Sequence, residues 1–363
     1  MGGADDAEVC FPLGRLPRAL SLVATVLCAL VAAPPAMAQS AGEEVSSVMA
    51  SEELSAPGPD GSLAGTLLLP NADDATGSGL ADGAPVVLIV PGSGPTDRNG
   101  NSPLGIAAAP YKLLAEALAE RGFASMRIDK RGMFGSSGAV PDPNDVTIAA
   151  YGDDLLAWVE VIRDRLPQEK GARCVVPLGH SEGGLVALAA MERVPNACGL
   201  ILAAAPGRPL AEALREQLAA NLANAPLLEQ ADGAIASLER GELVDETTLH
   251  PALAPLLAYK MQGFLIDAFA YDPVRLVRTV SVPVLVVQGE RDLQVSEADA
   301  RSLARGAPDA TLALVPNANH VLKPVETDDP TANLATYADP ALPVEPAIVD
   351  ATVEFLTSLD TAE

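Results

Sequence analysis

Residues 175–193 read VVPLGHSEGGLVALAAMER, and this stretch decides the fold. A short apolar run, 175–178, leads into a glycine-rich turn, and a helical pattern then continues to Arg193. The turn has the form G-x-S-x-G between a strand and a helix, which places Ser181 on a sharp bend at the carboxyl end of the strand. Glycines are needed there because larger side chains would collide where strand and helix pass closely. A chance glycine-rich turn is the alternative, and the flanking strand and helix argue against it.

Short apolar runs alternate with longer amphipathic segments along most of the chain. The runs predict strands at 66–69, 86–90, 124–128, 175–178, 200–204, 284–288 and 311–315. Helical spacing predicts helices at 111–121, 148–166 and 346–359. This alternation is typical of an α/β fold with a mostly parallel central sheet and helices on both faces.

Two segments depart from the alternation. Residues 39–61 are rich in Ser, Glu, Ala, Gly and Pro without a sustained period, which predicts a flexible leader, with order beginning near Leu63. Residues 207–271 are rich in Ala, Leu and Glu with helical spacing, which predicts a helical lid inserted into the sheet domain. Residues 62–206 and 272–363 are then expected to form one core.

The first 38 residues have the pattern of a secretory signal. Arg15 and Arg18 precede an apolar run at 19–33, and small residues lead up to a cleavage site after Ala38. The run is short for a membrane span, so we expect an exported protein, periplasmic or secreted, without stable membrane insertion after cleavage. An uncleaved anchor is the alternative.

Cleavage would leave two cysteines, Cys174 and Cys198, in an oxidising compartment. Each precedes an apolar run, and the two runs are expected to be neighbouring parallel strands, which allows one disulfide. Two free buried thiols are the alternative.

Composition limits the partners. The chain has 363 residues, 49% of them hydrophobic, which is enough for a large core, and its formal net charge is -25. Nucleic acids and anionic membranes would be repelled by this charge, so we expect a small-molecule substrate and no nucleic-acid partner. The sequence leaves the oligomeric state open.

A serine nucleophile needs a base, and the chain has three histidines. His320 follows the last expected strand, on the loop where this fold places the base. His180 lies beside the nucleophile and is expected to pack away from the path of attack. His250 lies in the expected lid and is interpreted as a surface or helix-start residue.

The histidine in turn needs a carboxylate to orient it. Glu290 and Asp292 both follow the strand expected at 284–288, and the glycine turn just before them favours Asp292. The order serine, acid, histidine along the chain is the one expected for this arrangement.

Two backbone N–H groups are needed to stabilise a developing oxyanion. One is expected from Glu182, which follows the nucleophile, and the other from Ser93 in the turn Pro91-Gly92-Ser93-Gly94-Pro95. A simple turn at the end of the strand is the alternative for the second.

The chain resembles the EstD-like bacterial carboxylesterases, a branch of the α/β-hydrolase superfamily close to the serine aminopeptidase-like hydrolases. The similarity is carried by residues 91–100 (PGSGPTDRNG), 129–137 (DKRGMFGSS), 179–184, and 289–292 with Asn319 and His320. It implies the α/β-hydrolase fold, Ser181, Asp292 and His320 as catalytic residues, Ser93 and Glu182 as oxyanion donors, and no metal or organic cofactor.

The expected function is hydrolysis of carboxylic esters with short to medium acyl chains, through an acyl-enzyme on Ser181. A serine aminopeptidase or amidase and a thioesterase with the same residues remain alternatives, as does a catalytically silent binding module. Charged residues near the site, Asp97, Arg98, Asp129 and Arg131, are expected to pair with one another and brace its rim. The carboxylates of residues 153 and 154 are expected to be solvated.

Overall fold

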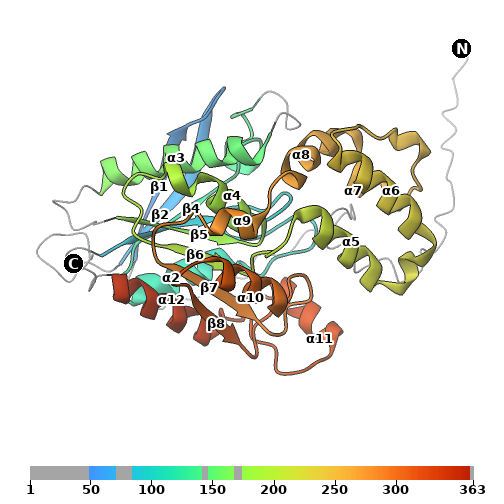
Figure 1. The fold of residues 1–363 in the computed structure, drawn as a ribbon. Helices are drawn as coiled ribbons and strands as arrows, with labels where there is room; N and C mark the ends of the chain where they lie inside the picture. The colour runs from blue at the N-terminus through green and yellow to red at the C-terminus, as the bar shows by residue number, and fades with distance from the viewer. Residues whose placement is uncertain (1–48, 71–83, 141–145, 167–173, 360–363) are drawn as a thin grey trace, which may run out of the picture.

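A computed structural model describes residues 49–70, 84–140, 146–166 and 174–359. The expected signal sequence at 1–38 and the first part of the expected leader lie outside these ranges. The described chain forms an eight-stranded sheet with helices on both faces (Figure 1). Within the described ranges, none of the helices combines the length and the apolar content that a membrane span requires.

The sheet has the order β1-β2-β4-β3-β5-β6-β7-β8. Its strands are β1 (Ala50–Pro57), β2 (Ser62–Leu69), β3 (Val86–Val90), β4 (Ser125–Ile128), β5 (Val175–His180), β6 (Leu200–Ala203), β7 (Val284–Gly289) and β8 (Thr311–Val315). The strands from β4 to β8 pair in parallel, whereas β1 with β2 and β2 with β4 pair antiparallel. The mostly parallel sheet and all seven expected strands are therefore confirmed.

Strand β1 corrects the expectation that order begins near Leu63. Residues 50–57, placed in the flexible leader from their composition, pair with β2 over their whole length, from Ala50 opposite Leu69 to Pro57 opposite Ser62. The strand lies at the edge of the sheet and most of its side chains are exposed. An edge strand tolerates such polar residues, so its composition is close to that of a loop.

Side chains alternate between the two faces of the sheet. On β3, Val86, Leu88 and Val90 belong to one buried cluster, and Val87 and Ile89 belong to the other, as the two-residue period of a strand requires. Strand β3 is buried on both faces, which explains why all five of its residues are apolar.

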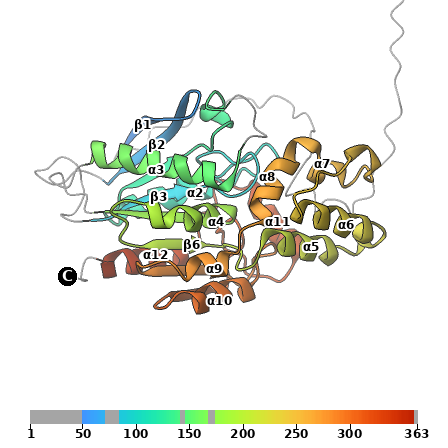
Figure 2. The ribbon, with the colours of Figure 1, turned by 45° about the horizontal axis from the view of Figure 1, so that its top comes forward.

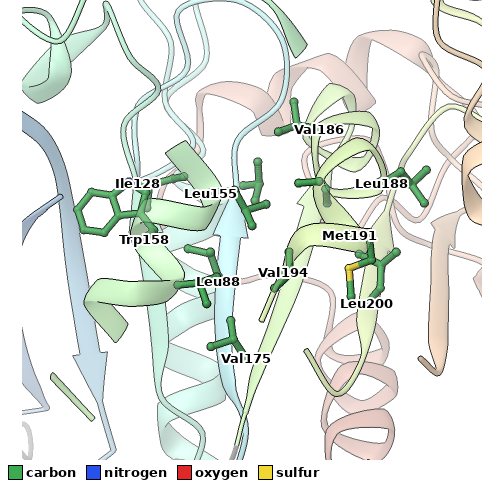
Figure 3. Close-up of a cluster of buried hydrophobic side chains, with 14 of the residues drawn as sticks. Leu88, Ile128, Leu155, Trp158, Val175, Val186, Leu188, Met191, Val194 and Leu200 are labelled. Atoms are coloured by element: carbon green, nitrogen blue, oxygen red, sulfur yellow. The ribbon is translucent and has the colours of Figure 1, made fainter. Parts of the chain in front are cut away.

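Helices from separate parts of the chain cover the two faces. One face packs against α3 (Ile148–Arg165), α4 (Glu182–Ala190), α9 (Pro273–Val277) and α10 (Glu297–Gly306). The other packs against α2 (Pro110–Glu120) and α12 (Pro346–Ser358). Figure 3 shows part of the first cluster, where Leu155 and Trp158 of α3 lie over Leu88 of β3.

The segment between β6 and α9 is helical. It contains α5 (Leu210–Ala220), α6 (Leu228–Glu239), α7 (Ala254–Leu257) and α8 (Tyr259–Phe269), which project beyond one end of the sheet (Figure 2). These helices bury their own apolar cluster, including Leu218, Ile235 and Leu257. Asp267 of α8 accepts a hydrogen bond from the Ile148 N–H at the start of α3, at 2.7 Å, and so fixes the end of this helical insertion to the core.

Cys174 and Cys198 form a disulfide, with Cα atoms 5.9 Å apart. The bridge joins the start of β5 to the segment that precedes β6, its parallel neighbour. Between these strands the register changes by one residue, from Val175 opposite Ala197 to Leu178 opposite Ile201. The change of register lies beside Pro177, whose nitrogen cannot donate a ladder hydrogen bond.

Candidate active site

The turn between β5 and α4 holds Ser181 in a strained conformation, with φ 54° and ψ −125°. Close packing explains the glycines around it. A Cβ on Gly183 would lie 2.3 Å from the carbonyl oxygen of Val90, and a Cβ on Gly179 would lie 2.4 Å from that of Gly183. Such contacts are impossible for a real side chain, so the sequence pattern is required by the passage of helix over strand.

His320 and Asp292 meet at the same end of the sheet. His320 follows β8, Asp292 follows β7, and the His320 Nδ1 to Asp292 Oδ2 distance is 2.8 Å. The Asp292 side chain is completely buried, and that of His320 is 7% exposed. Exclusion of water strengthens this hydrogen bond. Because Nδ1 is engaged with Asp292, Nε2 is the ring nitrogen that can accept a proton from a nucleophile.

The Asp292 carboxylate is held by four donors. Its Oδ1 accepts from the N–H groups of Gln294 and Val295, at 2.7 and 2.9 Å, and its Oδ2 accepts from His320 and from Gln288 Nε2, the latter at 3.1 Å. These bonds fix the orientation of the carboxylate and satisfy its charge without solvent.

The loop that carries His320 is braced by the residue before it. Asn319 donates from Nδ2 to Asn333 Oδ1, at 3.1 Å, and to Thr336 Oγ1, at 2.7 Å, and its Oδ1 accepts from the Lys323 N–H at 3.0 Å. Asn319 is buried. The loop conformation is therefore set by side-chain hydrogen bonds, which position the histidine.

The rival residues lie away from this arrangement. Glu290 is exposed on the surface, so the geometry favours Asp292 as the partner of His320. His250 is also exposed, and its Nδ1 accepts from the Ala252 N–H at 3.2 Å, which agrees with its interpretation as a surface residue at a helix start.

Two backbone N–H groups are free beside Ser181. Glu182 is the first residue of α4, where an N–H has no partner within the helix. Among the described residues, neither the Glu182 N–H nor the Ser93 N–H donates a hydrogen bond. A Cβ on Gly92, next to Ser93, would lie only 3.1 Å from Ser181 Cβ, so this loop passes directly beside the serine.

Gly92 is held at both of its polar atoms. Its N–H donates to Tyr111 Oη at 3.0 Å, and its carbonyl oxygen accepts from Lys130 Nζ at 2.6 Å. Tyr111 and Lys130 are both buried. The loop beside Ser181 is therefore fixed by two side chains that come from α2 and from the end of β4.

His180 connects this loop to the loop of His320. Its Nδ1 lies 2.9 Å from Tyr111 Oη, and its Nε2 lies 2.7 Å from the His320 carbonyl oxygen. A carbonyl only accepts, so Nε2 carries the proton and Nδ1 accepts from the tyrosine hydroxyl. Burial, with the neighbouring charge of His320, lowers the pKa of His180 to about 3. His180 therefore does more than the packing expected of it, because both of its ring nitrogens form hydrogen bonds that link the two loops.

The charged residues expected at the rim of the site form only some of the expected ion pairs. Arg98 pairs with Asp129 as expected, with Nη2 to Oδ2 at 2.7 Å. Arg131 instead pairs with Asp154, at 2.7 Å, so Asp154 is buried and not solvated. Among the arginines that the structure describes, none pairs with Asp97, which accepts the N–H groups of residues 99 and 101 and so shapes its own loop. These pairs join segments that are far apart in sequence.

A cavity of about 410 Å³ opens at Ser181, within the size range of small-molecule sites. Ser93, Glu182 and His320 line it together with the serine. The helical insertion supplies a mostly apolar wall: Leu210, Ala213, Leu214, Leu256, Met261, Phe264 and Leu265. Gln217 and Lys260 of the insertion also line the cavity. The site thus combines polar groups from the sheet domain with a mostly apolar wall from the insertion.

This arrangement has the parts that acyl transfer requires. A strained serine, a histidine oriented by a carboxylate, and two free N–H groups surround one cavity. Sequence reasoning selected all five residues but missed Tyr111 and the role of Lys130. Lys130 comes just after β4 and Tyr111 is the second residue of α2, so their contacts with Gly92 depend on the order of the strands in the sheet.

The sheet order, the strand–turn–helix bend at Ser181 and the position of the His320–Asp292 pair define an α/β-hydrolase. The chain belongs to the family described as serine aminopeptidase, S33, whose model matches residues 105–328. The matched region contains Ser181, Asp292 and His320 and begins after Ser93.

Known proteins are similar to this chain over different lengths. Esterase EstD of Thermotoga maritima is 29% identical over 219 residues, which cover 59% of this chain and 48% of that protein. The chain therefore matches about half the length of this curated relative.

Among solved structures, the Pyrococcus furiosus esterase Pf2001 has a TM-score of 0.52 at 14% identity, covering 90% of this chain and 99% of that one. Est1E from Butyrivibrio proteoclasticus has a TM-score of 0.51 at 18% identity, covering 85% and 98%. At these identities the structural likeness establishes the fold.

Proposed function

We propose that this protein is a carboxylesterase that cleaves esters with short to medium apolar acyl chains, with Ser181 as nucleophile. The proposal rests on one observation: the strained serine, the His320–Asp292 pair and the two free N–H groups surround a single cavity with an apolar wall. The similarity to esterase EstD supports the same activity.

Acylation follows from the roles of these groups. His320 takes the proton of Ser181 Oγ as the oxygen attacks the ester carbonyl carbon, and the carbonyl π electrons move onto its oxygen. The Ser93 and Glu182 N–H groups donate to this oxyanion. The tetrahedral intermediate then collapses, the bond to the alcohol oxygen breaks, and the proton held by His320 passes to that oxygen.

Deacylation repeats the sequence with water. His320 takes a proton from water as the water oxygen attacks the carbonyl carbon of the acyl-enzyme. Collapse of the second tetrahedral intermediate breaks the bond to Ser181 Oγ, returns the proton to that oxygen and releases the carboxylic acid. Asp292 holds the imidazole in the required tautomer and stabilises its protonated form in both halves.

The charges of the cavity favour an ester over the free amino terminus of a peptide. An aminopeptidase needs an acceptor for the substrate's ammonium group. Among the described residues that line the cavity, the carboxylates are Glu182 and Asp299. Glu182 pairs with Lys130, at 3.4 Å, and Asp299 pairs with Arg208, at 2.6 Å. Both carboxylates are engaged, so neither offers a free negative charge to an amine.

The test compares leaving groups on one acyl chain. Wild-type protein and Ser181→Ala are assayed with p-nitrophenyl butyrate, the matching p-nitroanilide and the matching thioester. Ester turnover that exceeds anilide turnover and disappears in Ser181→Ala supports the proposal. Faster anilide turnover would indicate an amidase, faster thioester turnover a thioesterase, and no turnover of any of the three a binding module.

We further propose that the protein is exported and that the segment 1–38 is removed. The signal-like sequence and the Cys174–Cys198 disulfide support this, because structural disulfides persist in oxidising compartments. The mass of the mature protein recovered from the periplasm or medium tests it: a chain that begins at Gln39 is expected, and retention of residues 1–38 would contradict export by cleavage.

A further inference from the structure

Lys130 has a buried ammonium group beside the candidate oxyanion site. Its side chain is 4% exposed, and its Nζ lies 2.6 Å from the Gly92 carbonyl oxygen, 3.4 Å from Glu182 Oε1 and 5.3 Å from the centre of the Tyr151 ring. Burial lowers the pKa of Lys130, and the neighbouring Glu182 opposes the shift. A buried charge is costly, so its position calls for an explanation.

The ion pair with Glu182 does not explain it fully. The carbonyl oxygen of Gly92 is the nearer partner, at 2.6 Å against 3.4 Å for the carboxylate. Well-packed apolar residues often replace a buried ion pair without loss of stability. The short contact with the backbone therefore points to a role in shaping the loop.

The contact acts on one particular peptide unit. The carbonyl of Gly92 and the N–H of Ser93 belong to the same planar peptide, in which the two groups point in opposite directions. Fixing the carbonyl oxygen therefore fixes the direction of the Ser93 N–H. A charged donor on the carbonyl also polarises the peptide and makes its N–H a stronger donor.

We propose that Lys130 is a positioning residue that orients and polarises the Gly92–Ser93 peptide, so that the Ser93 N–H stabilises the oxyanion formed on the substrate. The inference rests on the proposed function and names a residue beyond the five already assigned to it. The Lys130 ammonium contacts the Gly92 carbonyl oxygen, the Glu182 carboxylate and the Tyr151 ring. Lys130 also lines the cavity, and the inference assigns its effect to the contact with Gly92.

The preceding peptide is fixed independently. The Gly92 N–H donates to Tyr111 Oη at 3.0 Å, so the residue is held on both sides and the loop has little freedom to turn the Ser93 N–H away. Lys130 also reaches the side chain of Glu182, whose own N–H is the second proposed donor. One ammonium group thus connects the two segments that supply the oxyanion donors.

The experiment uses the full-length mature protein with three variants: Lys130→Met, the double variant Lys130→Met/Glu182→Gln, and Lys112→Met as a control on the surface of α2. Each is assayed for kcat and KM on p-nitrophenyl butyrate, and for unfolding by denaturant. Inhibition is measured with an alkyl trifluoromethyl ketone, which forms an oxyanion when serine adds to it, and with the matching methyl ketone.

For Lys130→Met we expect kcat to fall by about 10- to 100-fold, less than the loss of a whole oxyanion donor, with KM changed by less than about twofold. The trifluoromethyl ketone should bind more weakly by a similar factor, and the methyl ketone should bind equally well. Lys112→Met should match the wild type. A purely structural role would alter stability without this difference between the two ketones.

The double variant distinguishes loss of the contact between Lys130 and Gly92 from loss of the ion pair between Lys130 and Glu182. It leaves no unpaired carboxylate, so it tests the inference even where Lys130→Met alone fails to fold. We expect it to remain slow, because the Gly92 carbonyl still lacks its donor. Recovery of wild-type kcat in the double variant, or a folded Lys130→Met within about twofold of wild type, would overturn the inference. Failure of the proposed function is distinguishable, because the wild type itself would then show no ester turnover.

Discussion

The Nε2 atom of His180 lies 2.7 Å from the carbonyl oxygen of His320, so the residue before the nucleophile holds the backbone of the proposed base. Through Tyr111 the same ring is connected to the Gly92 N–H. The three loops that meet at the site are thus joined by one hydrogen-bonded chain. Such a network fixes relative positions that each loop alone would leave free.

This buried histidine makes stability depend on pH. His180 stays neutral in the folded protein down to a pKa of about 3, whereas an unfolded histidine titrates near 6.5. Between these values the unfolded state binds more protons, so the free energy of unfolding decreases as pH falls. The shift is caused first by burial and second by the charge of His320, and Asp292 opposes it.

A glutamine at this position keeps one donor and one acceptor but does not titrate. From about pH 6 to about pH 4, the wild type should lose roughly 2 to 3 kcal/mol more of its free energy of unfolding than His180→Gln. Urea unfolding of both proteins at the two pH values measures the difference. Equal losses would show that His180 is protonated in the folded state.

Removal of the negative charge at Asp292 should slow catalysis without disturbing the fold. Asp292→Asn is expected to lower kcat for p-nitrophenyl butyrate by about 10⁴-fold with little change in KM, because the amide stabilises the wrong tautomer of His320. The exposed neighbour provides the control, and Glu290→Gln should keep wild-type rates. If the Glu290 variant is the slow one, the assignment of the acid is wrong.

The wall formed by the insertion should limit the length of the acyl chain. Ala213 lines the cavity, so Ala213→Phe is expected to reduce kcat/KM for p-nitrophenyl octanoate by at least about tenfold while acetate turnover changes little. Ala219 lies exposed on the same helix, α5, and Ala219→Phe controls for the added ring. A uniform loss on all chain lengths would place the acyl group elsewhere.

The disulfide should contribute to stability and not to chemistry. It joins residues separated by 24 positions, for which loop-closure entropy gives about 3 kcal/mol. The double variant Cys174→Ala/Cys198→Ala should have a free energy of unfolding lower by about this amount, and so a lower denaturant midpoint. Its kcat should equal that of the wild type when it is folded. An unchanged unfolding midpoint would mean that the bridge does not form in solution.

The features that local sequence determines were predictable. The bend at Ser181 needs glycines at fixed positions. Short apolar runs along the chain mark buried strands, so the seven strands from β2 to β8 could be located from the sequence pattern. Asp292 and His320, the proposed acid and base, were selected because each follows a strand at the carboxyl edge.

The features that depend on distant partners were not predictable in the same way. Strand β1 is polar because it lies at the edge of the sheet, and its order comes from pairing with β2. Asp154 is buried because Arg131, 23 residues earlier, pairs with it. The contacts of Lys130 and His180 likewise join segments whose proximity follows only from the order of the strands.

The claim that Ser181 is the nucleophile of a serine hydrolase is tested most directly by covalent labelling. The mature protein and Ser181→Ala are incubated with a fluorophosphonate, and the site of modification is located by peptide mass spectrometry. The account predicts one phosphonyl group per wild-type chain, on Ser181, with parallel loss of ester turnover, and no label on the variant. Full turnover with Ser181 unlabelled, or a label that persists on Ser181→Ala, would contradict it.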